Sequence, residues 1–310
     1  MTMRFLPALL TLSLLAGSAA AQFLPVPPKS AAQIAKADAA LALAPLSVMD
    51  KSLTPASGDK HDYLSFGPYW WPDPAKPGGL PYIRRDGERN PAVSKGSDSI
   101  HLSKLGAAVE ALGQAYAATR DERYAMKAAT LVRVWFLDEK TRMNPNFQHA
   151  QAIPGITPGR GIGLIESRWL INLNEGLALL GSSPSWPAAE RAALKAWMGE
   201  FYTWLRTSQN GRDEEREHNN HGTWYDAQAA HLALVLGKQA DAKAILSVGL
   251  GRRLVAHIAP DGAQPHELAR TRSLDYSIFN LEALFLCAEL ASHVDLDWWN
   301  FSTSDGRSLR

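Results

Sequence analysis

The sequence predicts an all-α fold built from antiparallel helix hairpins. Apolar residues recur at intervals of three and four in one segment after another, which is the spacing of one face of an α-helix. No stretch shows a convincing strand-like alternation of apolar and polar residues. Short turns join neighbouring helices, as at residues 120–122 and 181–185, and short connections imply antiparallel neighbours. Such hairpins can stack into a ring or a solenoid.

The first 21 residues predict a signal peptide. Residues 5–16 are almost wholly apolar and follow Arg4, and small residues at 19–21 form a cleavage site. This apolar stretch is too short to span a bilayer, and no later stretch is long and uncharged enough to do so. We therefore expect an exported protein, periplasmic or secreted, whose mature part is residues 22–310.

About eight helices are expected along the mature chain. Ser185, with Pro187 and Glu190 soon after it, gives a clear helix start, and Gly237 gives a plausible helix end. The predicted helices cover residues 31–43, 100–118, 126–137, 164–180, 186–205, 222–236, 241–258 and 277–291.

Two long segments interrupt this series, residues 52–95 and 144–163, and both are rich in Pro and Gly. Structureless loops of this length are uncommon in a compact domain and are usually functional. No low-complexity linker divides the chain, so we expect one domain. Residues 301–310 look like a turn that leads into another helix, so we expect a truncated C-terminus.

Composition and motifs argue against several classes of function. The formal net charge of +1 argues against a general nucleic-acid binder. The single cysteine, Cys287, lies in an apolar run and is expected to be a small buried residue. No spacing of His, Glu or Cys suggests a metal, and no phosphate loop or serine-nucleophile elbow is present. Paired carboxylates for glycoside hydrolysis stay open, with Glu166, Asp226 and Glu267 as the best candidates.

The most informative stretch is residues 219–225, Asn-Asn-His-Gly-Thr-Trp-Tyr. It lies at an expected helix start, where free backbone N–H groups favour anions, and it adds an imidazole that titrates near neutral pH. His221 and Tyr225 are four residues apart, as are Asn220 and Trp224, so each pair projects along one helix face. The pattern fits a capped helix start and a site that grips a sugar acid equally well.

Two other stretches carry charge and aromatic rings. Arg270 and Arg272 precede Tyr276 at the start of an apolar helix, although alone they would fit a solvated surface pair. The early loop interleaves aromatics and arginines around Gly78 and Gly79, which suits either a lid over a charged ring-shaped ligand or a loop that packs its tryptophans on the core. Residues 143–149 and 159–161 supply further donors.

These motifs together resemble the alginate lyase family, exported bacterial enzymes that cleave uronic-acid polysaccharides, and in particular a branch with glucuronan and alginate lyases. The resemblance implies an incomplete α/α toroid with a substrate cleft across one face. It also implies a metal-independent β-elimination that needs no cofactor. The resemblance covers nearly all of the mature chain, and the motifs that carry it are residues 68–74, 79–84, 219–222, 270–273, 276–277 and 280–281.

The resemblance also implies catalytic roles. The C6 carboxylate of a uronate must be neutralised before H5 can be removed, and Asn220 and Arg270 match the residues that do this. Tyr276 matches the acid that protonates the departing O4. The base would be Tyr276 when H5 and O4 lie on one side of the ring, and His221 when they lie on opposite sides. Helical spacing would instead favour Arg272 over Arg270, whereas Asn219 is expected to cap the helix.

The expected partner is an anionic polysaccharide, and no nucleic acid, membrane span or protein partner is implied. Two rival functions stay open: a glycoside hydrolase on a similar toroid, and a non-catalytic protein that binds acidic oligosaccharides. The residues assigned to substrate binding are Tyr69, Trp70, Arg84, Arg85, Arg272 and Trp224.

Overall fold

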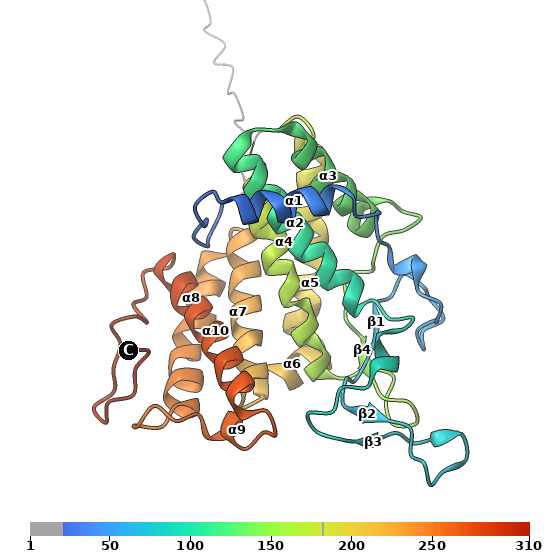
Figure 1. The fold of residues 1–310 in the computed structure, drawn as a ribbon. Helices are drawn as coiled ribbons and strands as arrows, with labels where there is room; N and C mark the ends of the chain where they lie inside the picture. The colour runs from blue at the N-terminus through green and yellow to red at the C-terminus, as the bar shows by residue number, and fades with distance from the viewer. Residues whose placement is uncertain (1–20, 182) are drawn as a thin grey trace, which may run out of the picture.

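The computed structural model describes residues 21–181 and 183–310, and helices dominate it (Figure 1). The predicted signal peptide lies outside these residues except for Ala21. Within the described ranges, none of the helices combines the length and apolarity that crossing a membrane requires. The predicted all-α class is confirmed, while the closure of the helices into a toroid stays a prediction.

The described residues form ten α-helices. Eight of them overlap the predicted helices, and the short helices α6 and α9 were not predicted. The helices are α1 (Ala31–Leu41), α2 (Ser99–Thr119), α3 (Glu122–Val132), α4 (Trp169–Ala178), α5 (Ala188–Thr207), α6 (Gln209–Arg216), α7 (Asn220–Val235), α8 (Gln239–Gly249), α9 (Pro265–Leu268) and α10 (Ser273–Ser292).

Shorter helical turns extend or link these helices. The π-helical turns η4 and η6 continue α3 and α8, so the predicted helix at 241–258 contains a change of winding. The predicted helix at 164–180 likewise begins as the 3₁₀ helix η5. The bounds are η1 (Val48–Asp50), η2 (Pro77–Gly79), η3 (Pro91–Ser94), η4 (Arg133–Leu137), η5 (Gly161–Arg168) and η6 (Leu250–Val255).

Helices α2 and α4 pack closely because glycines lie at their contact. A Cβ atom on Gly113 would lie 2.1 Å from the carbonyl oxygen of Gly176, so no larger residue fits there. On the other side of the core, α7 packs against both α8 and α10, which lie beside it in Figure 1. It is buried on nearly every side, which explains why its sequence shows no single apolar stripe. Cys287 is buried in this region, as predicted.

Four short strands come from the two long non-helical segments, where the sequence showed no strand. β1 (Leu64–Phe66) pairs in parallel with β4 (His149–Ala152). β2 (Trp70–Trp71) pairs antiparallel with β3 (Ile83–Arg84). Strands of two to four residues are too short for an alternating pattern to be visible. β2 begins directly after Tyr69, which contacts Tyr276 in the first turn of α10.

Residues 301–310 form a turn closed by a bridge between Ser302 and Ser308, not the start of a helix. The Arg307 guanidinium ties this turn to the carbonyl oxygens of Val255 and Ile258. The predictions of one domain and of a truncated C-terminus stay predictions.

Candidate active site

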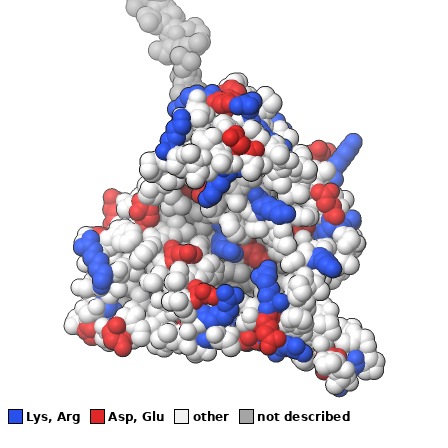
Figure 2. Space-filling model, viewed as in Figure 1, with Lys and Arg blue, Asp and Glu red and all other residues white. Residues whose placement is uncertain are grey.

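A pocket of about 770 Å³ opens between the N-terminal ends of α7 and α10, the start of α2, the η5–α4 junction and the β2–β3 loop. The face drawn in Figure 2 is hollowed near its middle and carries both signs of charge. Eight of the ten predicted site residues line the pocket. These are Tyr69, Trp70, Arg84, Asn220, His221, Arg270, Arg272 and Tyr276.

The Asn-Asn-His stretch, residues 219–221, both caps helix α7 and lines the pocket. Asn219 is the N-cap of α7, and its side chain accepts a hydrogen bond from the backbone N–H of His221 at 3.0 Å. The next residue, Asn220, is buried and lines the pocket. Its backbone N–H and side-chain amide donate to the two oxygens of Glu267 at 2.6 and 2.7 Å. Glu267 therefore fixes the orientation of the Asn220 amide.

A buried carboxylate also fixes His221. Nδ1 of His221 lies 2.9 Å from Oε1 of Glu214 on α6, whose side chain is fully buried. Burial raises the pKa of Glu214, and the neighbouring His221 opposes this. With Glu214 ionised, Nδ1 carries the proton, and Nε2 of the neutral ring is left as a proton acceptor. Sequence reasoning missed Glu214 because α6 is a short, strongly polar segment with no apolar periodicity.

The turn before α7 rests on a buried ion pair. Arg253 is paired with Asp226 at 2.8 Å, and its other nitrogens donate to the carbonyl oxygens of Glu215 and Glu217 at 2.6 Å each. Gly222 fits against this arrangement only because it has no side chain. A Cβ there would lie 2.0 Å from the Glu217 oxygen and 2.2 Å from Nη1 of Arg253. The buried pair thus holds the backbone that presents Asn220 and His221.

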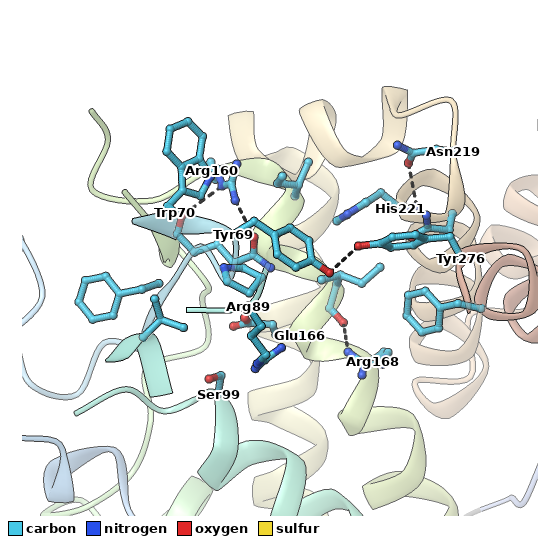
Figure 3. A pocket seen from close by; sticks show the side chains of 18 of the residues that line it. Tyr69, Trp70, Arg89, Ser99, Arg160, Glu166, Arg168, Asn219, His221 and Tyr276 are labelled. Atoms are coloured by element: carbon cyan, nitrogen blue, oxygen red, sulfur yellow. Dashed lines mark hydrogen bonds between the residues drawn. The ribbon is translucent and has the colours of Figure 1, made fainter. Parts of the chain in front are cut away.

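Tyr276 faces the opposite, loop-built side of the pocket. Its hydroxyl lies 2.5 Å from that of Tyr69, which comes just before β2 (Figure 3). The Arg270 guanidinium lies 3.8 Å from the centre of the Tyr276 ring and also donates to Asp86 at 2.9 Å. Burial, followed by the Tyr69 contact, raises the pKa of Tyr276, while Arg270 lowers it. Tyr276 is therefore protonated at neutral pH in this arrangement.

The two arginines of this stretch differ in exposure. The Arg270 side chain is 18% exposed and covers Tyr276, whereas the Arg272 side chain is 61% exposed and pairs with Asp275. The hydrogen bond from Arg270, ahead of other causes, holds the pKa of Asp86 well below its usual range. Arg270 is thus the arginine beside the candidate acid, and Asp86 holds it there.

Two predicted binding residues lie away from the pocket lining. The Arg85 guanidinium lies 5.3 Å from the centre of the Trp71 ring, and neither residue lines the pocket. Trp224 is buried, donates to the Phe279 carbonyl oxygen at 3.1 Å and stacks near the Phe279 ring. Because α7 is buried nearly all round, a residue one turn after Asn220 enters the core rather than the pocket.

The pocket also contains charged residues that sequence reasoning did not assign to it. Glu166 accepts hydrogen bonds from Tyr63 and Ser65 at 2.8 and 2.6 Å, and burial raises its pKa. Arg160 donates to Gln151 at 2.8 Å, and burial lowers its pKa to about 10. The arginines that line the pocket are Arg84, Arg89, Arg160, Arg168, Arg270 and Arg272, and its acids are Glu166, Glu217 and Asp275. Cationic lining of this kind suits an anionic ligand.

Within residues 21–181 and 183–310, no group of three or more His, Cys, Asp and Glu side chains is placed to hold a metal ion. Buried carboxylates instead orient single candidate groups, Glu214 the His221 ring and Glu267 the Asn220 amide.

Comparison with known proteins shows to which family the chain is related. A family model described as alginate lyase matches residues 47–310. The crystal structure of an alginate lyase from Bacteroides ovatus is 44% identical in sequence, with a TM-score of 0.87, and the match covers 90% of this chain and 73% of that chain. No curated protein matches the chain. By its sequence and its fold, the chain belongs to the alginate lyase family, a family of polysaccharide lyases.

Proposed function

We propose that this protein cleaves a uronic-acid-containing polysaccharide, alginate or glucuronan, by a metal-independent β-elimination that leaves an unsaturated uronate end. The observation that carries the proposal is the meeting of His221, Arg270 and Tyr276 in one pocket. These residues come from two segments of the chain, and each is held by its own partner. A large polymer substrate also fits the exported location, periplasmic or secreted, that the leader predicts.

The carboxylate of the bound uronate is the first requirement. Removal of H5 places negative charge on the C6 carboxylate, so donors must face this group before the proton leaves. Arg270 supplies a charged donor, and Asn220 supplies an amide whose orientation is set by Glu267. These protein donors take the part that a Lewis acid would otherwise play.

Proton transfer is the second requirement. A base takes H5, the electron pair of that bond forms the C4–C5 double bond, and the C4–O4 bond breaks as an acid protonates O4. Nε2 of His221 is the base when H5 and O4 lie on opposite sides of the ring, and Glu214 stabilises the imidazolium that forms. The Tyr276 hydroxyl is the acid, which suits its raised pKa.

When H5 and O4 lie on the same side, Tyr276 would have to act as both base and acid. It would then have to be ionised before the reaction, and its raised pKa opposes this. The Arg270 guanidinium on its ring favours the ionised form. The His221 route is therefore the easier one in the arrangement described.

The rival reading as a glycoside hydrolase has less support. Of the three carboxylates that the sequence offered, only Glu166 lines the pocket. Asp226 is fully buried in its pair with Arg253, and Glu267 is buried against Asn220. A hydrolase needs two carboxyl groups that flank one bond.

Product chemistry tests the proposal directly. The chain should be incubated with alginate, polymannuronate, polyguluronate and glucuronan while absorbance is followed near the ultraviolet edge, where the unsaturated uronate absorbs. New absorbance with at least one polymer is expected. Reducing sugar without this absorbance would instead indicate a hydrolase, and calorimetric binding without any product would indicate a binding protein.

A further inference from the structure

Arg168 is a charged residue that lines the pocket and has no role in the proposed mechanism. It ends η5, and its guanidinium lies among three aromatic rings, 4.9 Å from the centre of Trp169, 5.3 Å from Phe279 and 6.0 Å from Trp224. Its one hydrogen bond within the described residues runs from Nη1 to the backbone oxygen of Ile165 at 3.0 Å. Arginine has five N–H donors, so most donors of the Arg168 guanidinium make no hydrogen bond to a described residue.

The other enclosed arginines of the pocket are differently placed. Arg270 is paired with Asp86, and Arg160 donates to both the backbone and the side chain of Gln151. Arg168 forms no ion pair with a described residue. Burial lowers the pKa of Arg168, and the charge of Glu166, which lines the same pocket beyond ion-pair distance, opposes this. A partly buried guanidinium that lines a pocket and has no carboxylate within ion-pair distance is suited to bind one from a ligand.

The position of Arg168 relative to the candidate catalytic groups follows from helix geometry. Two of its aromatic neighbours lie on the same helices as those groups. Trp224 is four residues after Asn220 on α7, and Phe279 is three residues after Tyr276 on α10. Three to four residues are about one helical turn, or ~5 Å along the axis. Arg168 therefore lies beside residues one turn further along α7 and α10 than Asn220 and Tyr276, and Figure 3 shows it on the same side of the pocket as Tyr276.

We infer that Arg168 binds the carboxylate of a second uronate unit, adjacent to the unit that loses its proton. This inference rests on the proposed function and deepens it, because it makes the preferred ligand a run of neighbouring uronates. The Arg168 guanidinium lies among aromatic rings, lines the pocket and donates one hydrogen bond within the described residues, so further N–H groups can pair with the two oxygens of a carboxylate. A neutral sugar at this position would leave the buried charge unpaired.

Binding measurements with an inactive chain test this inference apart from catalysis. The probes are a mannuronate tetrasaccharide and the same tetrasaccharide with its carboxyl groups reduced to alcohols, and Kd is measured by calorimetry in the Tyr276→Phe background. Arg168→Gln should weaken binding of the tetrasaccharide by about tenfold or more, as for loss of a charge-assisted hydrogen bond. Binding of the reduced tetrasaccharide should change by less than about twofold, the range expected for a contact that involves no charge.

A matched control is Arg120→Gln. The Arg120 guanidinium also lies near an aromatic ring, 5.6 Å from the centre of Tyr116. Arg120 follows the C-terminal end of α2, and the pocket lies at the opposite end of this helix, where Ser99 lines it. The control should leave both Kd values unchanged. Arg168→Lys keeps the positive charge, so it should fold even if the glutamine variant does not. Because lysine lacks the planar guanidinium, this variant should bind the charged tetrasaccharide several-fold more weakly than the chain with Arg168 does.

Two results would overturn the inference. One is an unchanged Kd for the charged tetrasaccharide in both Arg168 variants, and the other is an equal loss for the charged and the reduced tetrasaccharide, which would indicate a structural role. The proposed lyase activity would survive either result, provided that the wild-type chain produces the unsaturated product. Failure of the wild-type chain to bind or cleave any uronate polymer would instead contradict both proposals.

Discussion

The two walls of the pocket are built in different ways. The helical wall, at the N-terminal ends of α7 and α10, presents candidate groups that buried carboxylates hold from behind, Glu214 behind His221 and Glu267 behind Asn220. The loop wall, residues 67–90, contains strands of two residues and contacts the helical side through Tyr69, which meets Tyr276, and through Asp86, which pairs with Arg270. Catalysis needs groups fixed to within a fraction of an ångström, so the chemistry is expected to reside in the helical wall.

The first prediction tests that assignment with the largest expected effect. Tyr276→Phe removes the candidate acid and keeps the ring under Arg270, so kcat should fall by about a thousandfold. The Kd for an oligouronate should stay within about threefold, because the phenyl ring preserves the packing. Initial rates from ultraviolet absorbance and calorimetric Kd values measure the two effects. Near-normal turnover would remove Tyr276 from the mechanism.

The second prediction concerns the buried support of the helical wall. Gly222→Ala would place a Cβ 2.0 Å from the Glu217 carbonyl oxygen, so the backbone must shift, at a cost of about 2–3 kcal/mol in the free energy of unfolding. Because the same backbone presents His221, kcat should fall as well.

Gly199→Ala is its control. A Cβ at Gly199, inside α5, would meet only Leu236 at 3.8 Å, so this variant should be as stable as the wild type or up to ~1 kcal/mol more stable. Urea unfolding of both variants gives the comparison. Equal stability of the two would contradict the view that Gly222 is required by close packing.

Sequence reasoning worked best where a motif and its geometry coincide. The Asn219 cap and the start of α7 follow from local preferences alone, and the structure confirms both. The positions of Glu214 and Glu267 could not be predicted in this way. Glu214 lies on a polar helix without apolar periodicity, and Glu267 meets Asn220 from 47 residues away. Local patterns carry no information about such partners.

The features that the sequence did not indicate have a similar cause. Trp224 shares a helix face with Asn220, as its spacing implied, yet that face turns into the core because α7 is enclosed by its neighbours. The short strands that steer the long loops exist only because the loops meet each other and the helices. Packing between distant segments decides both features, and a single sequence displays neither.

The third prediction separates the two possible bases. Glu214→Gln keeps the shape but no longer stabilises a charged His221, so kcat on polyguluronate should fall by about ten- to a hundredfold. In guluronate, H5 and O4 lie on opposite sides, which calls for His221. Polymannuronate, with both on one side, should lose less. Glu215→Gln is the control, since that side chain only pairs with the partly exposed Arg206 and Arg252.

The same variant should change how stability depends on pH. Burial raises the pKa of Glu214 above its unfolded value of about 4.3. The stability that this group contributes is therefore fully present below that value and is lost as pH rises through its folded pKa. In Glu214→Gln this group no longer titrates. The free energy of unfolding of this variant should therefore fall less than that of the wild type between acidic and neutral pH. An identical pH dependence in both proteins would show that Glu214 does not titrate in this way.

The smallest effect is expected in the loop wall. Tyr69→Phe removes one hydroxyl of the Tyr69–Tyr276 pair, which otherwise raises the pKa of Tyr276. A neutral hydrogen bond is worth about 1 kcal/mol, so kcat/KM should change by only three- to tenfold. Lys76→Gln, on the exposed tip of the same loop, serves as the control. A thousandfold loss in Tyr69→Phe would place the chemistry in both walls, and the contrast between a catalytic helical wall and a binding loop wall would no longer hold.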